Sequence, residues 1–195
     1  MRIAGWMALG GALALALVPV SALPALAGKD AVDVGPVFVP QLDPAGGEVP
    51  AAVAQAVGEI NLARDFCSRL KRKEYVIDCL AAEMDAAADA LPSTPEYAPA
   101  KAALKEGSRK LAKIVTDNQS ATLQPGVARD SGHATPRPIR AVETSRMDTA
   151  TDAAIGVIQE TGTVLLRSSE TSAEAAGFVA ISTAVRSNTI LLRSI

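Results

Sequence analysis

The two cysteines of the chain, Cys67 and Cys79, restrict its fold more than any other feature. If residues 67–79 formed one continuous helix, the cysteines would be about 18 Å apart along its axis, whereas a disulfide needs Cα atoms about 5.5 Å apart. A bond between them therefore requires the chain to reverse direction near the charged residues 71–74. We expect a structural disulfide that joins two antiparallel helices. A redox-active or metal-binding pair is the alternative, but the sequence has neither a C-x-x-C motif nor a His/acid cluster to support it.

The N-terminus indicates that the protein reaches an oxidising compartment, where such a bond persists. Met1 and Arg2 precede an apolar run over residues 3–18, and residues 25–27 read Ala-Leu-Ala, a pattern that signal peptidase recognises. We predict a signal peptide over residues 1–27 and a secreted or periplasmic protein that begins at Gly28. A retained membrane anchor is the alternative, but about 16 apolar residues are fewer than the roughly 20 that a membrane-spanning helix needs.

Residues 28–50 are expected to form an extended leader. Proline occurs at positions 36, 40, 44 and 50, with glycine at positions 35, 46 and 47. Each proline removes a backbone donor and biases the preceding residue away from helix. Within this leader, residues 37–39 could form a short edge strand or lie across a groove, but we favour a flexible arm.

Helical periodicity begins at Ala51. Apolar residues recur every three or four positions over about 51–70 and 76–91, and a third pattern begins at residues 93–96 and ends near Asn118. These patterns predict a three-helix unit over residues 51–118. The stripe expected to be buried on the first helix consists of Val53, Val57, Ile60, Arg64, Cys67 and Leu70, widened by Leu62 and Phe66.

The remainder of the chain is divided between a loop and two further helical patterns. Residues 119–146 lack periodicity and are rich in turn residues, so we expect a loop or linker there. Residues 147–195 predict a helical hairpin with helices over about 147–168 and 172–195. We therefore expect an all-α protein in which a disulfide-pinned three-helix unit precedes this hairpin. No transmembrane span is expected in the mature chain, because its charged residues interrupt every apolar run.

Two groups of residues are candidates for contacts with other molecules. Small residues at Ala176, Ala180 and Ala184 form a ridge at i, i+4 spacing, where another helix could approach closely. The densest basic run could contact an anionic lipid or polymer, or could be a solvated turn that complements a helix C-terminus. Its members are Arg69, Lys71, Arg72 and Lys73.

Candidate catalytic residues are few. His133, the only histidine, lies in the predicted loop, where we expect it to be a surface residue. Glu83, Asp85 and Asp89 could form a carboxylate pair or bind a divalent ion, but they are expected on the solvated face of a helix. The sequence contains no nucleophile elbow, phosphate loop, zinc spacing or calcium loop. We therefore assign no catalytic, metal-binding or cofactor-binding residue.

The composition limits the classes of partner. The chain carries 19 Lys and Arg against 21 Asp and Glu, and this balance gives no basic face for a nucleic acid. We expect a non-catalytic envelope protein that acts by helix-mediated contact with a second copy or with a partner protein. Two alternatives are a hydrolase that acts on cell-wall or lipid material through an Asp or Glu, and a carrier of a small apolar ligand.

Overall fold

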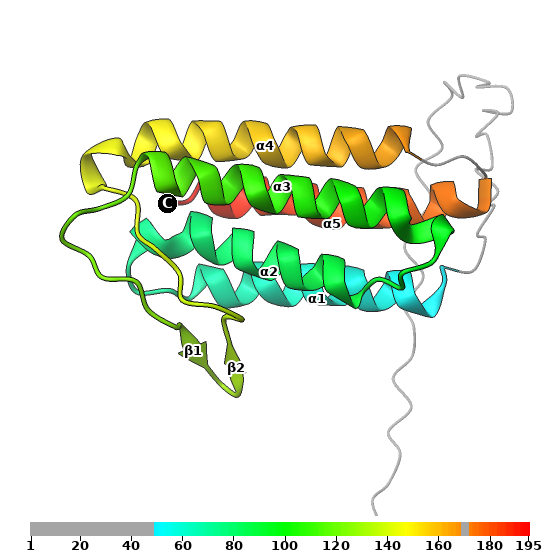
Figure 1. The fold of residues 1–195 in the computed structure, drawn as a ribbon, viewed down its shortest axis with the longest axis horizontal. Helices are drawn as coiled ribbons and strands as arrows, with labels where there is room; N and C mark the ends of the chain where they lie inside the picture. Colours follow the sequence, from blue (N-terminus) through cyan, green and yellow to red (C-terminus); the bar gives the residue numbers. More distant parts are fainter. Residues whose placement is uncertain (1–48, 169–171) are drawn as a thin grey trace, which may run out of the picture. The chain divides into compact units, whose positions relative to one another are not determined.

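The computed structural model describes residues 49–168 and 172–195, which are mostly helical (Figure 1). The predicted signal peptide, and the predicted leader up to residue 48, lie outside the described residues. The described part contains five α-helices: α1 (Ala51–Ser68), α2 (Val76–Ala90), α3 (Ala98–Asp117), α4 (Met147–Arg167) and α5 (Ser172–Leu192). These bounds agree closely with the helical periodicity of the sequence.

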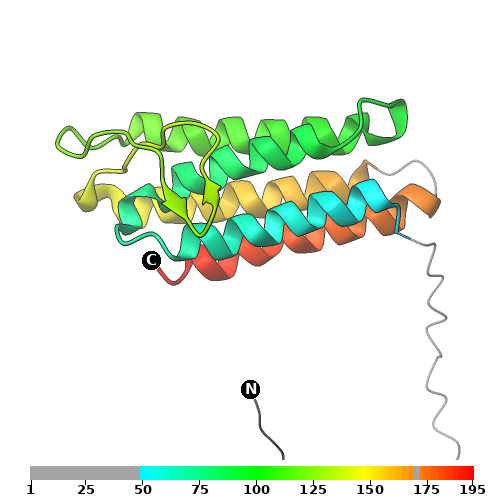
Figure 2. The same cartoon turned by 90° about the horizontal axis from the view of Figure 1, so that it is seen from below.

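The five helices form a closed ring in which each packs beside two others. The neighbours along the chain are in contact, and α5 also contacts α1. Successive helices run in opposite directions, so that α1 and α5, the first and last of an odd number, run parallel (Figures 1 and 2). The C-terminal helix pair is therefore packed against the first three helices along two seams, α3–α4 and α5–α1.

Prolines mark the end of α2 and the start of α3. Leu91 leaves the helical conformation directly before Pro92, as expected for a residue that precedes proline. A single 3₁₀ turn over Pro95–Tyr97 then leads into α3. Proline is favoured in the first turn of a helix, because the backbone N–H that it lacks would have no partner there.

The buried side of α1 contains Val53, Ile60, Phe66 and Cys67, as the sequence stripe predicts. Leu62 is an error in that stripe, because its side chain is 62% exposed. At about 100° per residue, Leu62 lies about 200° around the helix from the buried Ile60 and therefore points away from the bundle.

Helix α2 is buried almost all round, and every residue from 76 to 84 is buried. The reason is that residues 119–146 fold back over it. Two short antiparallel strands, β1 (Arg129–Asp130) and β2 (His133–Ala134), form a hairpin within this segment. Isolated bridges join Gln119 to Val142 and Gly126 to Ile139. We call residues 119–146 the covering loop.

Candidate functional site

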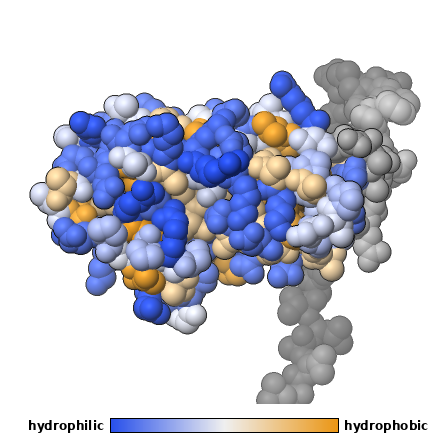
Figure 3. Space-filling model, in the orientation of Figure 1, coloured by the Kyte–Doolittle hydropathy of each residue, from blue (hydrophilic) through white to orange (hydrophobic). Residues whose placement is uncertain are grey.

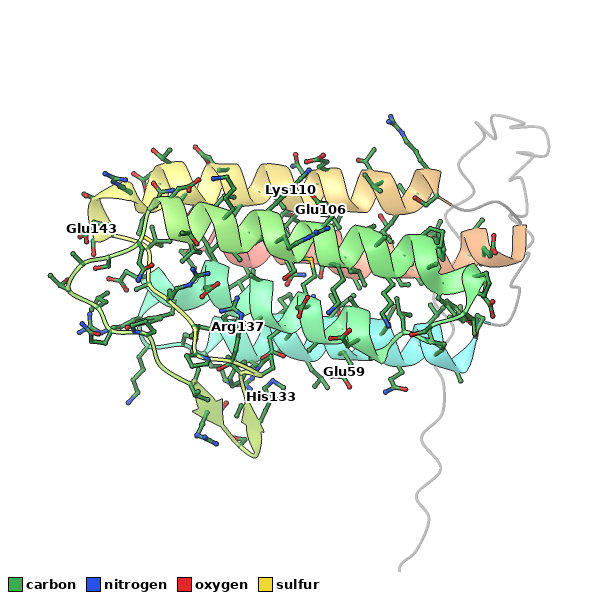
Figure 4. The ribbon with its side chains drawn as sticks, viewed as in Figure 1. Glu59, Glu106, Lys110, His133, Arg137 and Glu143 are labelled. Atoms are coloured by element: carbon green, nitrogen blue, oxygen red, sulfur yellow. A yellow bond between two sulfur atoms is a disulfide. The ribbon has the colours of Figure 1, made fainter. Side chains whose placement is uncertain are left out.

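A buried carboxylate on α2 anchors the covering loop. Asp78 is fully buried, and its Oδ1 and Oδ2 accept hydrogen bonds from Arg137 Nη2 and Nη1 at 2.7 and 2.9 Å. The backbone N–H of Arg140 donates to Asp78 Oδ2 at 2.7 Å, and the Arg140 guanidinium donates to both oxygens. Figure 4 shows the labelled Arg137 beside α2. Asp78 thus binds two arginines that follow it by 59 and 62 residues in the sequence. These contacts fix the path of the covering loop over α2.

The electrostatics of Asp78 reflect this pairing. Burial is the largest single influence and by itself would raise the pKa of Asp78, but the hydrogen bonds from Arg137 and Arg140 together outweigh it. The pKa of Asp78 therefore lies below its usual value. The carboxylate stays ionised, as a structural ion cluster requires.

A second buried acid, Glu83, lies beside the hairpin. Its side chain is 6% exposed, and its Oε1 is 3.1 Å from His133 Nε2. The His133 ring also packs edge-on against Phe66 of α1, with ring centroids 4.5 Å apart. Burial raises the pKa of Glu83, while the hydrogen bond and charge of His133 lower it and Glu59 raises it further; the net change is upward. His133 was expected to be a surface loop residue; its side chain is 42% exposed, but it lies in β2 and contacts Glu83 and Phe66. The solvated position expected for Glu83 is wrong.

The other two acids of the predicted cluster have a different environment. Lys105 of α3 lies 2.9 Å from Asp85 Oδ1 and 2.7 Å from Asp89 Oδ2. The two carboxylates thus share one cation at the α2–α3 seam, and Asp89 is exposed. Among the described residues, no group of three or more His, Cys, Asp or Glu side chains is placed to hold a metal ion.

The disulfide predicted from the sequence is present. Cys67 in the last turn of α1 is bonded to Cys79 in the first turn of α2, with Cα atoms 5.9 Å apart. It ties together the two helices that carry Phe66, Asp78 and Glu83. An intramolecular disulfide is consistent with an exported protein, since oxidising compartments preserve such bonds.

The predicted basic run lies on the turn between α1 and α2. Arg69 donates to Asp130 of the hairpin at 2.6 Å. The side chains of Lys71, Arg72 and Lys73 are exposed and have no partner among the described residues. We call these three residues the basic turn. Lys71 and Arg72 border a pocket of about 250 Å³, whose other walls are formed by Leu70, Tyr75 and the covering loop.

Close contacts pack α5 against α1. A Cβ atom at Gly177 would lie 3.2 Å from a methyl group of Val53, so these two helices approach closely at that point. Ten residues further along α5, Ser187 accepts a hydrogen bond from Arg64 of α1 at 3.0 Å. The side of α5 that includes residues 177 and 187 therefore faces α1.

The small-residue ridge lies on or next to that same side of α5. Ala180 and Ala184 follow Gly177 at helical spacing; Ala184 is 5% exposed, and Ala180 packs against the core. Ala176 is half-buried. The structure thus brings two of the three ridge residues against the protein's own bundle and leaves Ala176 at its edge.

Helices α4 and α5 are joined by a buried polar contact and by an exposed one at their outer edge. Ser182 of α5 donates to the carbonyl of Gly162 at 2.8 Å, and Arg186 donates to Thr163 Oγ1 at 2.8 Å. The Arg186 side chain lies directly over Gly162, where a Cβ atom would be 2.6 Å from its Nε. A side chain at position 162 would therefore displace the arginine.

Apolar residues remain exposed along this edge. Val179 and Ile190 share the outward side of α5 with Arg186, at spacings of seven and four residues, and are 49% and 71% exposed. Leu166, one turn beyond Gly162 on α4, is 42% exposed. We call Leu166, Val179 and Ile190 the outer stripe. Helices α2 and α3 carry no exposed large hydrophobic residue, and the face toward the viewer in Figure 3, where α3 lies in front, is largely hydrophilic.

The composition of α5 is apolar for an outer helix. Within the described residues, only the stretch Glu174–Leu192 is long and apolar enough to cross a membrane. Half of that stretch is buried against the other helices, and core helices of soluble proteins can have the same length and apolar composition. Packing of the helices against one another therefore accounts for part of the apolar character of α5, and Val179 and Ile190 remain exposed.

Sequence reasoning missed the Asp78–Arg137–Arg140 cluster. The available signal was an acid flanked by Ile77 and Cys79 within a continuous apolar run, which is an unusual place for an unpaired charge. Its partners could not be identified, because several arginines lie in the loop and no local pattern distinguishes two of them.

No protein-family model, curated protein or solved structure matches this chain significantly. Its function must therefore be inferred from its own residues.

Proposed function

We propose that this protein is an exported, non-catalytic helical protein that acts by contact between its outer helices and another helical surface. The observation that carries the proposal is the outer stripe. Leu166, Val179 and Ile190 are exposed on α4 and α5, whereas the exposed sides of α2 and α3 lack large apolar residues.

The chemistry of the buried polar groups supports a structural role for them. Both oxygens of the Asp78 carboxylate accept hydrogen bonds from Arg137 and Arg140. The polar partner of Glu83 is His133, which also packs against Phe66. Both acids contact the covering loop on α2 through these hydrogen bonds, which supports a structural role for them.

The first partner to test is a second copy of the chain, since symmetric homodimers are the commonest soluble assemblies. Two copies that meet through the outer stripe would bury Ile190 against the equivalent apolar surface. Arg186 would lie between Val179 and Ile190, close to the centre of such an interface. Arginine is enriched at the centres of protein interfaces.

The experiment measures molecular mass by light scattering over a range of protein concentrations. We expect the mature protein to exceed the monomer mass and Ile190→Lys to reduce it to the monomer, with unchanged helicity by circular dichroism. Leu62→Lys is the matched control, because Leu62 is similarly exposed but lies on α1.

A heterologous partner is the second outcome. If the mature protein is monomeric, a photo-crosslinking residue at position 190 should capture a specific envelope protein, while the same residue at position 62 should not. A monomer that gives no position-specific crosslink in its native compartment would refute contact through the outer stripe.

A further inference from the structure

The pocket beside the basic turn combines apolar walls with cations at its rim. Leu70, Tyr75, Val127 and Ile139 contribute the apolar surface, and Lys71 and Arg72 lie at the edge. The walls are held in place, because Tyr75 donates its hydroxyl hydrogen to the carbonyl of Gln124 at 2.7 Å. Gly126 and Ile139 also exchange two backbone hydrogen bonds, of 3.0 and 2.9 Å.

The cations of the basic turn form no ion pair with the described part of the chain. Asp130 is instead paired with Arg69 at 2.6 Å. Glu74, the acid next to Lys73, accepts a hydrogen bond from the uncharged Thr144 hydroxyl group at 3.3 Å. Three cations and one acid give residues 71–74 a formal charge of +2, and the three cations remain available to an external anion.

We propose that this pocket and the basic turn form a docking site for anionic phospholipid at a bilayer surface. Lys71, Arg72 and Lys73 contact the phosphate groups, and Val127, which is 41% exposed, enters the apolar edge of the bilayer with the pocket beside it. This proposal is independent of the outer stripe, since it concerns a different part of the molecule.

The open shape of the pocket favours a bilayer over a free small ligand. The pocket of about 250 Å³ is open to solvent rather than enclosed, and an adjoining pocket of about 460 Å³ shares Leu70, Lys71 and Ala128 with it. An isolated acyl chain bound there would therefore keep part of its apolar surface in water. In a bilayer, the neighbouring lipids cover that surface.

Vesicle sedimentation tests the proposal with the mature protein. We expect it to bind vesicles of phosphatidylcholine mixed with phosphatidylglycerol, and not vesicles of phosphatidylcholine alone. Each Lys or Arg near an anionic surface contributes about fivefold to binding, so Lys71→Gln/Arg72→Gln/Lys73→Gln should weaken binding about a hundredfold. The matched control removes the same charge from other exposed sites, as Arg109→Gln/Lys113→Gln/Arg167→Gln, and should keep most of the binding.

A second variant tests the apolar part of the site. Val127→Ser changes no charge, and we expect it to weaken vesicle binding about three- to tenfold because less apolar surface leaves water. Leu62→Ser is its control on α1 and should bind normally. Circular dichroism checks that each variant retains its helicity.

Four results would overturn the proposal. The first is absence of binding to anionic vesicles at low salt, and the second is an equal loss of binding in the charge-matched control, which would show that only net charge matters. The third is an unchanged affinity of Val127→Ser, which would exclude the pocket. The fourth is displacement from vesicles by inorganic phosphate at constant ionic strength, which would indicate a site for free phosphate instead.

Discussion

Replacement of Asp78 by asparagine should destabilise the protein more than replacement of any exposed acid. The carboxylate accepts five hydrogen bonds from Arg137 and Arg140. An amide has one acceptor oxygen, and if that oxygen takes the place of Oδ2, the amide NH₂ takes the place of Oδ1. There it would face the two Nη2 donors that lie 2.7 and 3.3 Å from Oδ1 in the native protein. Two charge-assisted hydrogen bonds are thereby lost and replaced by donor–donor contacts.

The magnitude follows from the number and exposure of these contacts. Hydrogen bonds to charged groups contribute about 1.5–3 kcal/mol each, so two of them give an upper range of about 3–6 kcal/mol. The side chains of Arg137 and Arg140 are 37% and 26% exposed, and water can therefore replace part of the loss. We expect Asp78→Asn to lower the free energy of unfolding by about 2–4 kcal/mol. This value is near the lower end of the range of about 3–5 kcal/mol for loss of one partner of a buried ion pair.

Urea denaturation followed by circular dichroism measures this change. Asp117→Asn is the control, because Asp117 pairs with Lys113 on the exposed surface of α3 and should change stability by less than about 1 kcal/mol. Trypsin gives a second measurement, since release of the covering loop should speed cleavage after the exposed Arg129. A loss below about 1 kcal/mol in Asp78→Asn, with no faster cleavage, would refute the role of Asp78 as the anchor.

The pH dependence of the same variant provides an independent check. The pKa of Asp78 is lowered in the folded protein from the ordinary value of 3.8, so the folded state binds the proton less readily than the unfolded state. The stabilisation is then complete above the unfolded pKa and disappears as the pH falls from about 3.8 through the folded pKa. Asp78→Asn should lack this component of acid destabilisation.

Three further predictions concern other parts of the fold. Because the folded pKa of Glu83 is raised above 4.5, its ionisation should reduce stability as the pH rises beyond that value, and Glu83→Gln should remove this decline in pH-dependent urea denaturation. Cys67→Ser/Cys79→Ser should lower the free energy of unfolding by about 3 kcal/mol in the chain-entropy model, with the oxidised wild type as reference. Gly107→Ala should lower the free energy of unfolding by about 1–3 kcal/mol through overpacking, because its Cβ atom would lie 2.5 Å from Thr161 Oγ1. The melting temperature should fall, and an unchanged value would contradict that contact.

The local elements could be predicted from the sequence because their signals are local. Helical periodicity indicates the helices and prolines mark the connection between α2 and α3, so the predicted bounds match α1 to α5 within a few residues. The pairing of Cys67 with Cys79 follows from the number of cysteines and the geometry of a disulfide. The position of Leu62 shows the limit of this reasoning, because a wide apolar stripe does not reveal which of its edges a neighbouring helix will cover.

The tertiary structure alone decided the surroundings of the charged residues. Asp78 and Glu83 lie on one helix, but their partners lie far along the chain in a segment without periodicity. Arg137 is 59 residues from Asp78, and His133 is 50 residues from Glu83. The apolar neighbours of Asp78 indicate that this acid could be buried, but its partners depend on what the distant chain places over the helix, and no pattern within the helix identifies them. The same holds for the alanine ridge of α5, of which Ala184 is buried, Ala180 packs against the core and Ala176 is half-buried because of how the helices pack together.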